Sequence, residues 1–132
     1  MYKAAELELN KLLGVTLERN ASDLHVVVGE PPIIRVDSSL IRLDNYQVSS
    51  NEMVLDLINV LLNENQQVIL KNQLDVDLSY SYKDNARFRV NIFFTKGTFA
   101  IAMRLIPNRI KSIEDLALPP ILRKFLQKKQ GL

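Results

Sequence analysis

The segment from Asn85 to Pro107, NARFRVNIFFTKGTFAIAMRLIP, constrains the fold more than any other stretch of this sequence. Two runs of strand-forming residues flank a Lys-Gly pair, which is typical of a tight hairpin turn. With this pair at the centre, the register that buries one face of the hairpin is fixed, because a shift of one residue would mix apolar and charged side chains on both faces. The apolar face then consists of the opposed pairs Phe94 with Phe99, Ile92 with Ile101, Val90 with Met103 and Phe88 with Leu105.

The same register places Arg89 directly opposite Arg104 on the other face. Opposed side chains have Cβ atoms about 4.5 to 5.5 Å apart, and like charges there are destabilising, so a counter-charge is expected. The alternating strand LDVDLSYSY precedes the hairpin, and a three-residue KDN turn sets its Ser79 opposite Arg89, with Asp77 on the diagonal. One interpretation is that Asp77 pairs with an arginine. The other is that the two guanidinium groups converge on a phosphate, and the spacing alone leaves both open.

The rest of the chain adds helices on either side of further strands. A leucine repeat predicts an amphipathic helix over residues 3–19, and DLHVVVGEPPIIRVD predicts two short strands broken at Gly-Glu-Pro-Pro, with a further strand in SLIRL. Ser49 and Glu52 have the spacing of a capping box at the start of a second helix, and a shorter helix follows in QQVILKNQ. Beyond Pro107 we expect a helical turn capped by Ser112 and a basic amphipathic helix.

Composition excludes several classes of function. The chain has 132 residues, no cysteine and a net charge of +2, so we expect one domain without disulfides or thiolate chemistry and without a field that attracts nucleic acid. No apolar run approaches the length of a membrane span, and the acidic N-terminal segment is unlike a signal peptide, which predicts a cytoplasmic protein. No glycine-rich phosphate loop is present, so the chain has no catalytic centre sufficient by itself.

Three weaker candidates for a site remain. His25 has no second histidine or cysteine with which to bind a metal, so we interpret it as structural. Asp75 and Asp77 share a strand face, which suits either an acid/base or metal pair or, as we prefer, a solvated face that partners the arginines. The basic segment RKFLQKK could contact nucleic acid or lipid, but its spacing favours a solvated helix side.

Four segments together resemble a known family: ASDLHVVVGEPPIIRVD, LDVDLSYSY, ARFRVNIFFTKGTFAIAMRLIP and SIEDLALPPILRKF. In order and spacing they are similar to the N-terminal domain of type IV pilus retraction ATPases (PilT type), within the type II/IV secretion ATPase superfamily. The resemblance implies an α+β, PAS-like fold, an antiparallel sheet with helices packed on one face. It also implies that residues 1–132 form a single N-terminal domain, and that the RecA-like catalytic domain is absent from this chain.

The resemblance further implies what the domain does. The family's phosphate-contacting arginines fall on Arg89 and Arg104, with Arg87 as a further candidate. The full-length protein would be a homo-hexameric ATPase that uses ATP and Mg²⁺, packs this domain on a neighbouring subunit, and works at the inner membrane with a pilus platform protein during twitching motility. The 132-residue chain by itself is then expected to bind no cofactor, to lack ATPase activity, and to self-associate.

Two alternatives stay open. Pilus extension and type II secretion ATPases share these motifs, although they generally carry a longer N-terminal module, so a chain that begins with a helix favours retraction. A stand-alone PAS-like ligand-binding or signalling module would place polar residues on its concave face. The inferred apolar face instead suits a packed core, which favours the motor.

Overall fold

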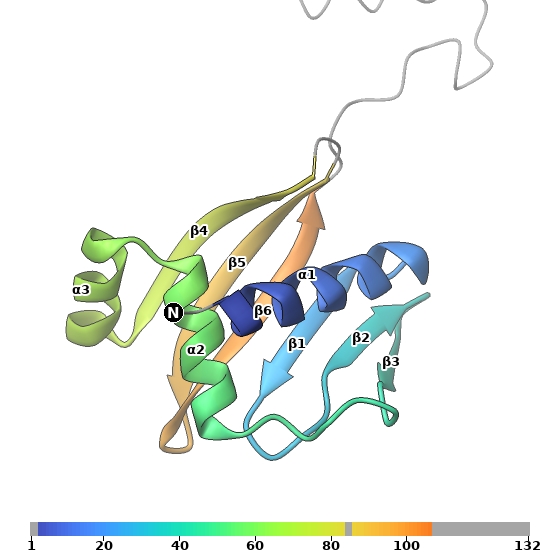
Figure 1. Cartoon of the computed structure of the whole chain (residues 1–132), viewed down its shortest axis with the longest axis horizontal. Helices are drawn as coiled ribbons and strands as arrows, with labels where there is room; N and C mark the ends of the chain where they lie inside the picture. The colour runs from blue at the N-terminus through green and yellow to red at the C-terminus, as the bar shows by residue number, and fades with distance from the viewer. Residues whose placement is uncertain (1–2, 84–85, 107–132) are drawn as a thin grey trace, which may run out of the picture.

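The computed structural model describes residues 3–83 and 86–106, which form three helices and one six-stranded antiparallel sheet (Figure 1). Across the sheet the strands run in the order β3-β2-β1-β6-β5-β4. The elements are α1 (Lys3–Glu18), β1 (Asp23–Val27), β2 (Ile33–Val36), β3 (Ser39–Arg42), α2 (Asn51–Leu61), α3 (Glu64–Gln73), β4 (Asp75–Tyr82), β5 (Ala86–Thr95) and β6 (Thr98–Ile106).

The sheet consists of two three-stranded halves. Strands β1, β2 and β3 follow one another along the chain in the first half, and β4, β5 and β6 do so in the second. Both halves use two-residue turns with positive φ, at Asp37 and Ser38 and at Lys96 and Gly97, as hairpins with right-handed strand twist require. Pairing of β1 with β6 joins the halves along what we call the central seam.

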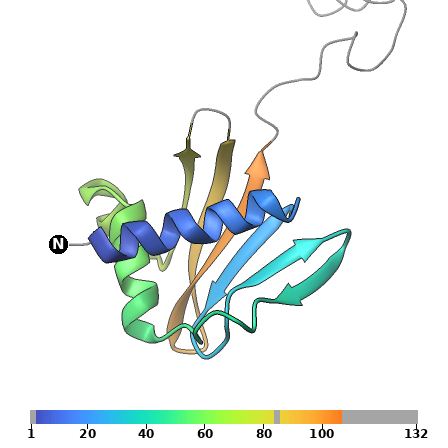
Figure 2. The same cartoon turned by 45° about the vertical axis from the view of Figure 1, so that its right-hand side comes forward.

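Helices α1 and α2 lie over the same face of the sheet, as the two views show (Figures 1 and 2). We call this the inner face and the opposite one the outer face. The alternation of β5 and β6 turns one set of their side chains toward the helices, so apolar surface is removed from water on both sides of the contact. The buried core residues include Leu9, Leu12 and Leu13 of α1, Val54 and Leu57 of α2, and Phe88, Val90, Ile92 and Met103 of the hairpin.

This arrangement confirms the predicted α+β class, with an antiparallel sheet and helices packed on one face. Both predicted registers are also confirmed: Arg89 lies opposite Arg104 and Ser79 lies opposite Arg89. The apolar face is less completely covered than expected, because Phe94, next to the hairpin turn, is 43% exposed and packs edge-on against Phe99. The PAS-like description stays a prediction.

The predicted start of the second helix is wrong by one residue. The hydroxyl of Ser50, not of Ser49, accepts a hydrogen bond from the Met53 amide at 3.1 Å and caps α2. The backbone of Ser49 is instead tied to the turn after β1, donating to the Glu30 carbonyl and accepting from the Gly29 amide. Ser49 is therefore held in the loop and buried, one residue before the helix.

In the described ranges 3–83 and 86–106, no helix is long and apolar enough to cross a membrane. The helical turn at Ser112 and the basic helix predicted after Pro107 lie outside the described residues.

Candidate functional site

The outer face carries a line of charged side chains that crosses four neighbouring strands. Strand pairing places Arg35 of β2 opposite Asp23 of β1, Asp23 opposite Arg104 of β6, and Arg104 opposite Arg89 of β5. We call these four residues the arginine row. Helices α1 and α2 lie on the other side of the sheet (Figures 1 and 2). With three positive charges against one negative charge, the row is suited to an anion.

Asp23 is the negative centre of the row. Its carboxylate accepts a hydrogen bond from Arg104 Nε to Oδ1 at 3.0 Å and one from the Ser22 hydroxyl to Oδ2 at 2.6 Å, and Arg35 Nε lies 3.7 Å from Oδ2. The Asp23 side chain is only 8% exposed, whereas that of Arg104 is 74% exposed. Burial raises the pKa of the Asp23 carboxyl, but the hydrogen bonds from Ser22 and Arg104 and the charge of Arg104 outweigh it, so the net pKa is below the ordinary value.

Arg89 differs from its neighbour Arg104. It is exposed, and within the described part of the chain neither Arg89 nor Arg87 forms an ion pair. Asp77 does lie diagonally from Arg89, as the sequence predicts, but its carboxylate accepts instead from the Asn91 amide at 3.3 Å. Asp75 also accepts from Asn91, at 2.7 Å. The ion pair between Asp77 and an arginine that sequence reasoning considered is therefore not formed.

Sequence reasoning missed Asp23 as the partner of Arg104. The pairing depends on the contact between β1 and β6, which lie far apart in the chain, and no local pattern identifies neighbours across that distance. One signal was available. Leu24 and Val26 face inward, so the alternation of β1 turns Asp23 and His25 to the outer face, where Arg104 also points.

His25 lies next to the arginine row on the outer face, opposite Ala102, and is half-buried. Burial lowers the pKa of its ring, Asp23 opposes this effect, and the charges of Arg35 and Arg104 lower the pKa further. The ring is therefore mainly neutral at pH 7. Within residues 3–83 and 86–106, no group of three or more acidic, histidine or cysteine side chains is arranged to hold a metal ion.

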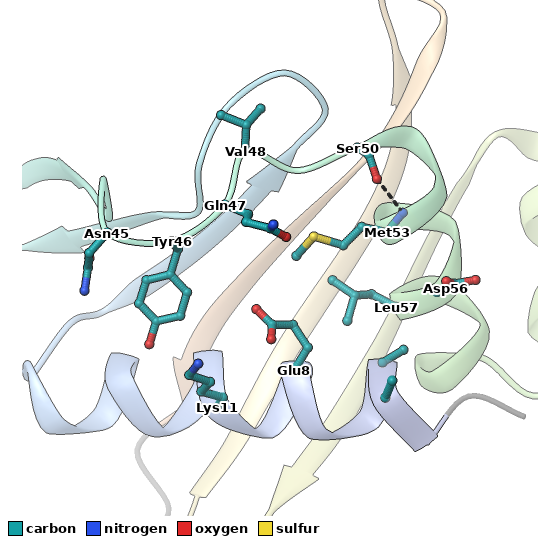
Figure 3. Close-up of a pocket in the computed structure, with 12 residues that line it drawn as sticks. Glu8, Lys11, Asn45, Tyr46, Gln47, Val48, Ser50, Met53, Asp56 and Leu57 are labelled. Carbon is teal, nitrogen blue, oxygen red and sulfur yellow. Dashed lines mark hydrogen bonds between the residues drawn. The ribbon is translucent and has the colours of Figure 1, made fainter.

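A separate hollow of about 810 Å³ lies on the helical side of the molecule. Figure 3 shows its labelled side chains coming from α1, from the loop before α2 and from α2, with Lys11 beneath the ring of Tyr46. The sheet contributes none of the residues that line it, so it is not the cavity between helices and sheet that a PAS-like sensor would use. Its charged side chains are Glu8, Asp56 and Lys11, and this acidic balance makes it less suited to phosphate than the arginine row is.

The comparisons with known proteins agree with this fold. No protein-family model matches the chain. The type IV pilus retraction ATPase PilT of Pseudomonas aeruginosa is 30% identical over 126 residues, which are 96% of this chain and 36% of that protein. A twitching motility protein of Neisseria gonorrhoeae is 34% identical over 101 residues, which are 76% of this chain and 27% of that protein.

A solved structure also matches the three-dimensional fold of this chain. The crystal structure of the pilus retraction motor PilT with bound ADP matches 86% of this chain and 33% of its own, with a TM-score of 0.75 and 27% identity. The chain thus spans about a third of the length of the proteins that it matches. By sequence and by fold, the chain is homologous to PilT and corresponds to the N-terminal domain of a type II/IV secretion ATPase.

Proposed function

We propose that this chain is the regulatory and assembly domain of a hexameric motor ATPase that retracts type IV pili. The observation that carries the proposal is the match to PilT along 96% of the chain, together with the TM-score of 0.75 to the solved retraction motor. Hydrolysis of ATP with Mg²⁺ would then belong to a RecA-like domain outside these 132 residues, since their sequence contains no glycine-rich phosphate loop.

In this proposal Arg89 and Arg104 contact the phosphates of a nucleotide, with Arg87 as a further contact. Their side chains lie at opposed positions of β5 and β6 on the outer face, and both are exposed. Guanidinium groups offer several donors in a planar fork, which matches phosphate oxygens. The related PilT structure contains ADP, so we propose a nucleotide as the anion that these arginines bind.

The test is ATP turnover by the full-length protein that carries this domain. Arg89→Ala and Arg104→Ala should each lower turnover strongly, by about 10³-fold if the arginine stabilises charge on the transferring phosphoryl group. Asp77→Ala is the matched control, because Asp77 lies on the same face but bonds Asn91. Wild-type turnover in both arginine variants would exclude the phosphate contact.

The assembly role predicts two properties of the 132-residue chain on its own. It should show no ATP hydrolysis above background, and it should self-associate at high concentration, because a surface that normally packs on a neighbouring subunit is left uncovered. Light scattering and an ATPase assay on the purified chain measure both. The same assembly would bring the full-length motor to the inner membrane through the pilus platform protein.

A further inference from the structure

We infer that Asp23 is a positioning residue, which holds the guanidinium group of Arg104 in the orientation that receives a phosphate. The inference rests on the proposed function, and it adds a residue and a reason for its place. Asp23 would not touch the nucleotide. It would act only through Arg104, and through the hydrogen bond that Ser22 donates to the same carboxylate.

Asp23 binds Arg104 through one particular nitrogen of its guanidinium group. Asp23 engages Nε, at 3.0 Å, and among the described residues the terminal nitrogens Nη1 and Nη2 form no hydrogen bond or ion pair. An arginine held through Nε keeps both terminal nitrogens for a second, bidentate contact. The side chain is 74% exposed, so these nitrogens are accessible to an incoming anion.

The Asp23 carboxylate is itself held at both of its oxygens. Asp23 lies in the middle of the sheet between β2 and β6, is 8% exposed, and receives the Ser22 hydroxyl on Oδ2 while Arg104 occupies Oδ1. The lowered pKa of its carboxyl agrees with this geometry, since the group stays ionised throughout the neutral range. A fixed anchor reduces the side-chain entropy that Arg104 would otherwise lose on binding.

Arg89 and Arg104 differ in their partners among the described residues. Both arginines are proposed to face the same anion, yet within residues 3–83 and 86–106 only Arg104 has a carboxylate partner. Asp77, the acidic residue nearest to Arg89 by register, is engaged by Asn91. The two arginines would therefore have different roles: Arg104 is held in place in advance, and Arg89 is free to adjust to the ligand.

The experiment is a double-mutant cycle on the full-length ATPase, with kcat/KM for ATP as the measurement. Asp23→Asn keeps the size of the side chain and removes the charge that orients Arg104. We expect a loss of about 10- to 100-fold, because misplacement of a binding group by about 1 Å costs up to about 10²-fold. Asp77→Asn, the same substitution on the same face, should leave kcat/KM within about twofold of wild type.

The informative comparison is the effect of Arg104→Ala in the two backgrounds. If Asp23 acts through Arg104, this substitution costs much less in the Asp23→Asn protein than in the wild type, because the orientation is already lost. Equal factors in both backgrounds would overturn the inference and leave Asp23 as a residue needed only for folding. Melting temperatures of all four proteins are measured alongside, since a purely structural role changes stability without this coupling.

The outcomes separate the inference from the proposed function. Wild-type kcat/KM in Arg104→Ala would refute the phosphate contact itself. A large loss in Arg104→Ala with none in Asp23→Asn would refute only the positioning role. Should Asp23→Asn fail to fold, Ser22→Ala removes one hydrogen bond to the carboxylate and keeps its charge, and a loss of severalfold that again depends on Arg104 is expected. No loss in Ser22→Ala would then count against the inference.

Discussion

The two faces of the β5–β6 hairpin come from the same two strands and differ completely in what they do. On the inner face Phe88, Val90 and Met103 are buried beneath the helices. On the outer face Arg89 and Arg104 stand at neighbouring positions and are exposed. Alternation along the strand thus separates the stability of the domain from the site proposed for nucleotide, so that each can be changed with limited effect on the other.

We expect the largest change in the free energy of unfolding from a substitution on the inner face. Phe88→Ala should lower the free energy of unfolding by about 3 to 5 kcal/mol, because it leaves a cavity in a fully buried position. Urea denaturation of the chain measures it. Arg89→Ala, one residue away on the other face, is the control and should change stability by no more than about 0.5 kcal/mol. Equal losses in both variants would show that the two faces are not separable.

Arg104→Ala should have an intermediate effect on the free energy of unfolding. It tests whether a substitution on the exposed outer face leaves the stability of the domain unchanged. Removal of Arg104 leaves the buried Asp23 carboxylate with weaker partners, so we expect a loss of about 1 to 2 kcal/mol, reduced from the value for a buried charged hydrogen bond because Arg104 itself is exposed. The difference from Arg89→Ala is the decisive quantity. If the two variants melt at the same temperature, the ion pair with Asp23 contributes nothing to folding.

The smallest effect is a dependence of stability on pH through His25. Its pKa in the folded chain lies below the ordinary value of 6.5, so the unfolded chain binds the proton more readily, and the free energy of unfolding falls as the pH falls from about 6.5. Asp23, whose pKa is also lowered, acts in the same direction below pH 3.8. Between about pH 7 and 5, the urea midpoint of the wild type should fall relative to that of His25→Gln on acidification. A wild type that becomes more stable relative to the variant at pH 5 would contradict this sign.

Local patterns were sufficient to predict the hairpin and its neighbour strand. The Lys-Gly turn and the alternation of β4, β5 and β6 determined both registers, because each connection is short and one face must be buried. The cap of α2 could not be resolved in this way, since Ser49 and Ser50 are chemically equivalent. The choice between them depends on backbone hydrogen bonds from Ser49 to the distant turn at Gly29 and Glu30.

Only part of the candidate site could be predicted from the sequence. The opposition of Arg89 and Arg104 follows from the hairpin, whereas the contribution of Asp23, Ser22 and Arg35 follows from how the first three strands pack on the last three. Asp77 was the nearest carboxylate along the chain, but Asn91 lies directly opposite it and takes its oxygen. Proximity in sequence was therefore a poor guide to which acid neutralises an arginine.

The central seam between β1 and β6 has a consequence for how the domain folds. Asp23 and Arg104 are 81 residues apart in the chain, so their contact closes a long loop, and such non-local contacts tend to form slowly. A chain in which only one half of the sheet has formed would lack the pair altogether. A nucleotide bound by Arg104 in the orientation that Asp23 holds would bind the completed sheet more tightly than the hairpin alone, and would stabilise the completed sheet by mass action.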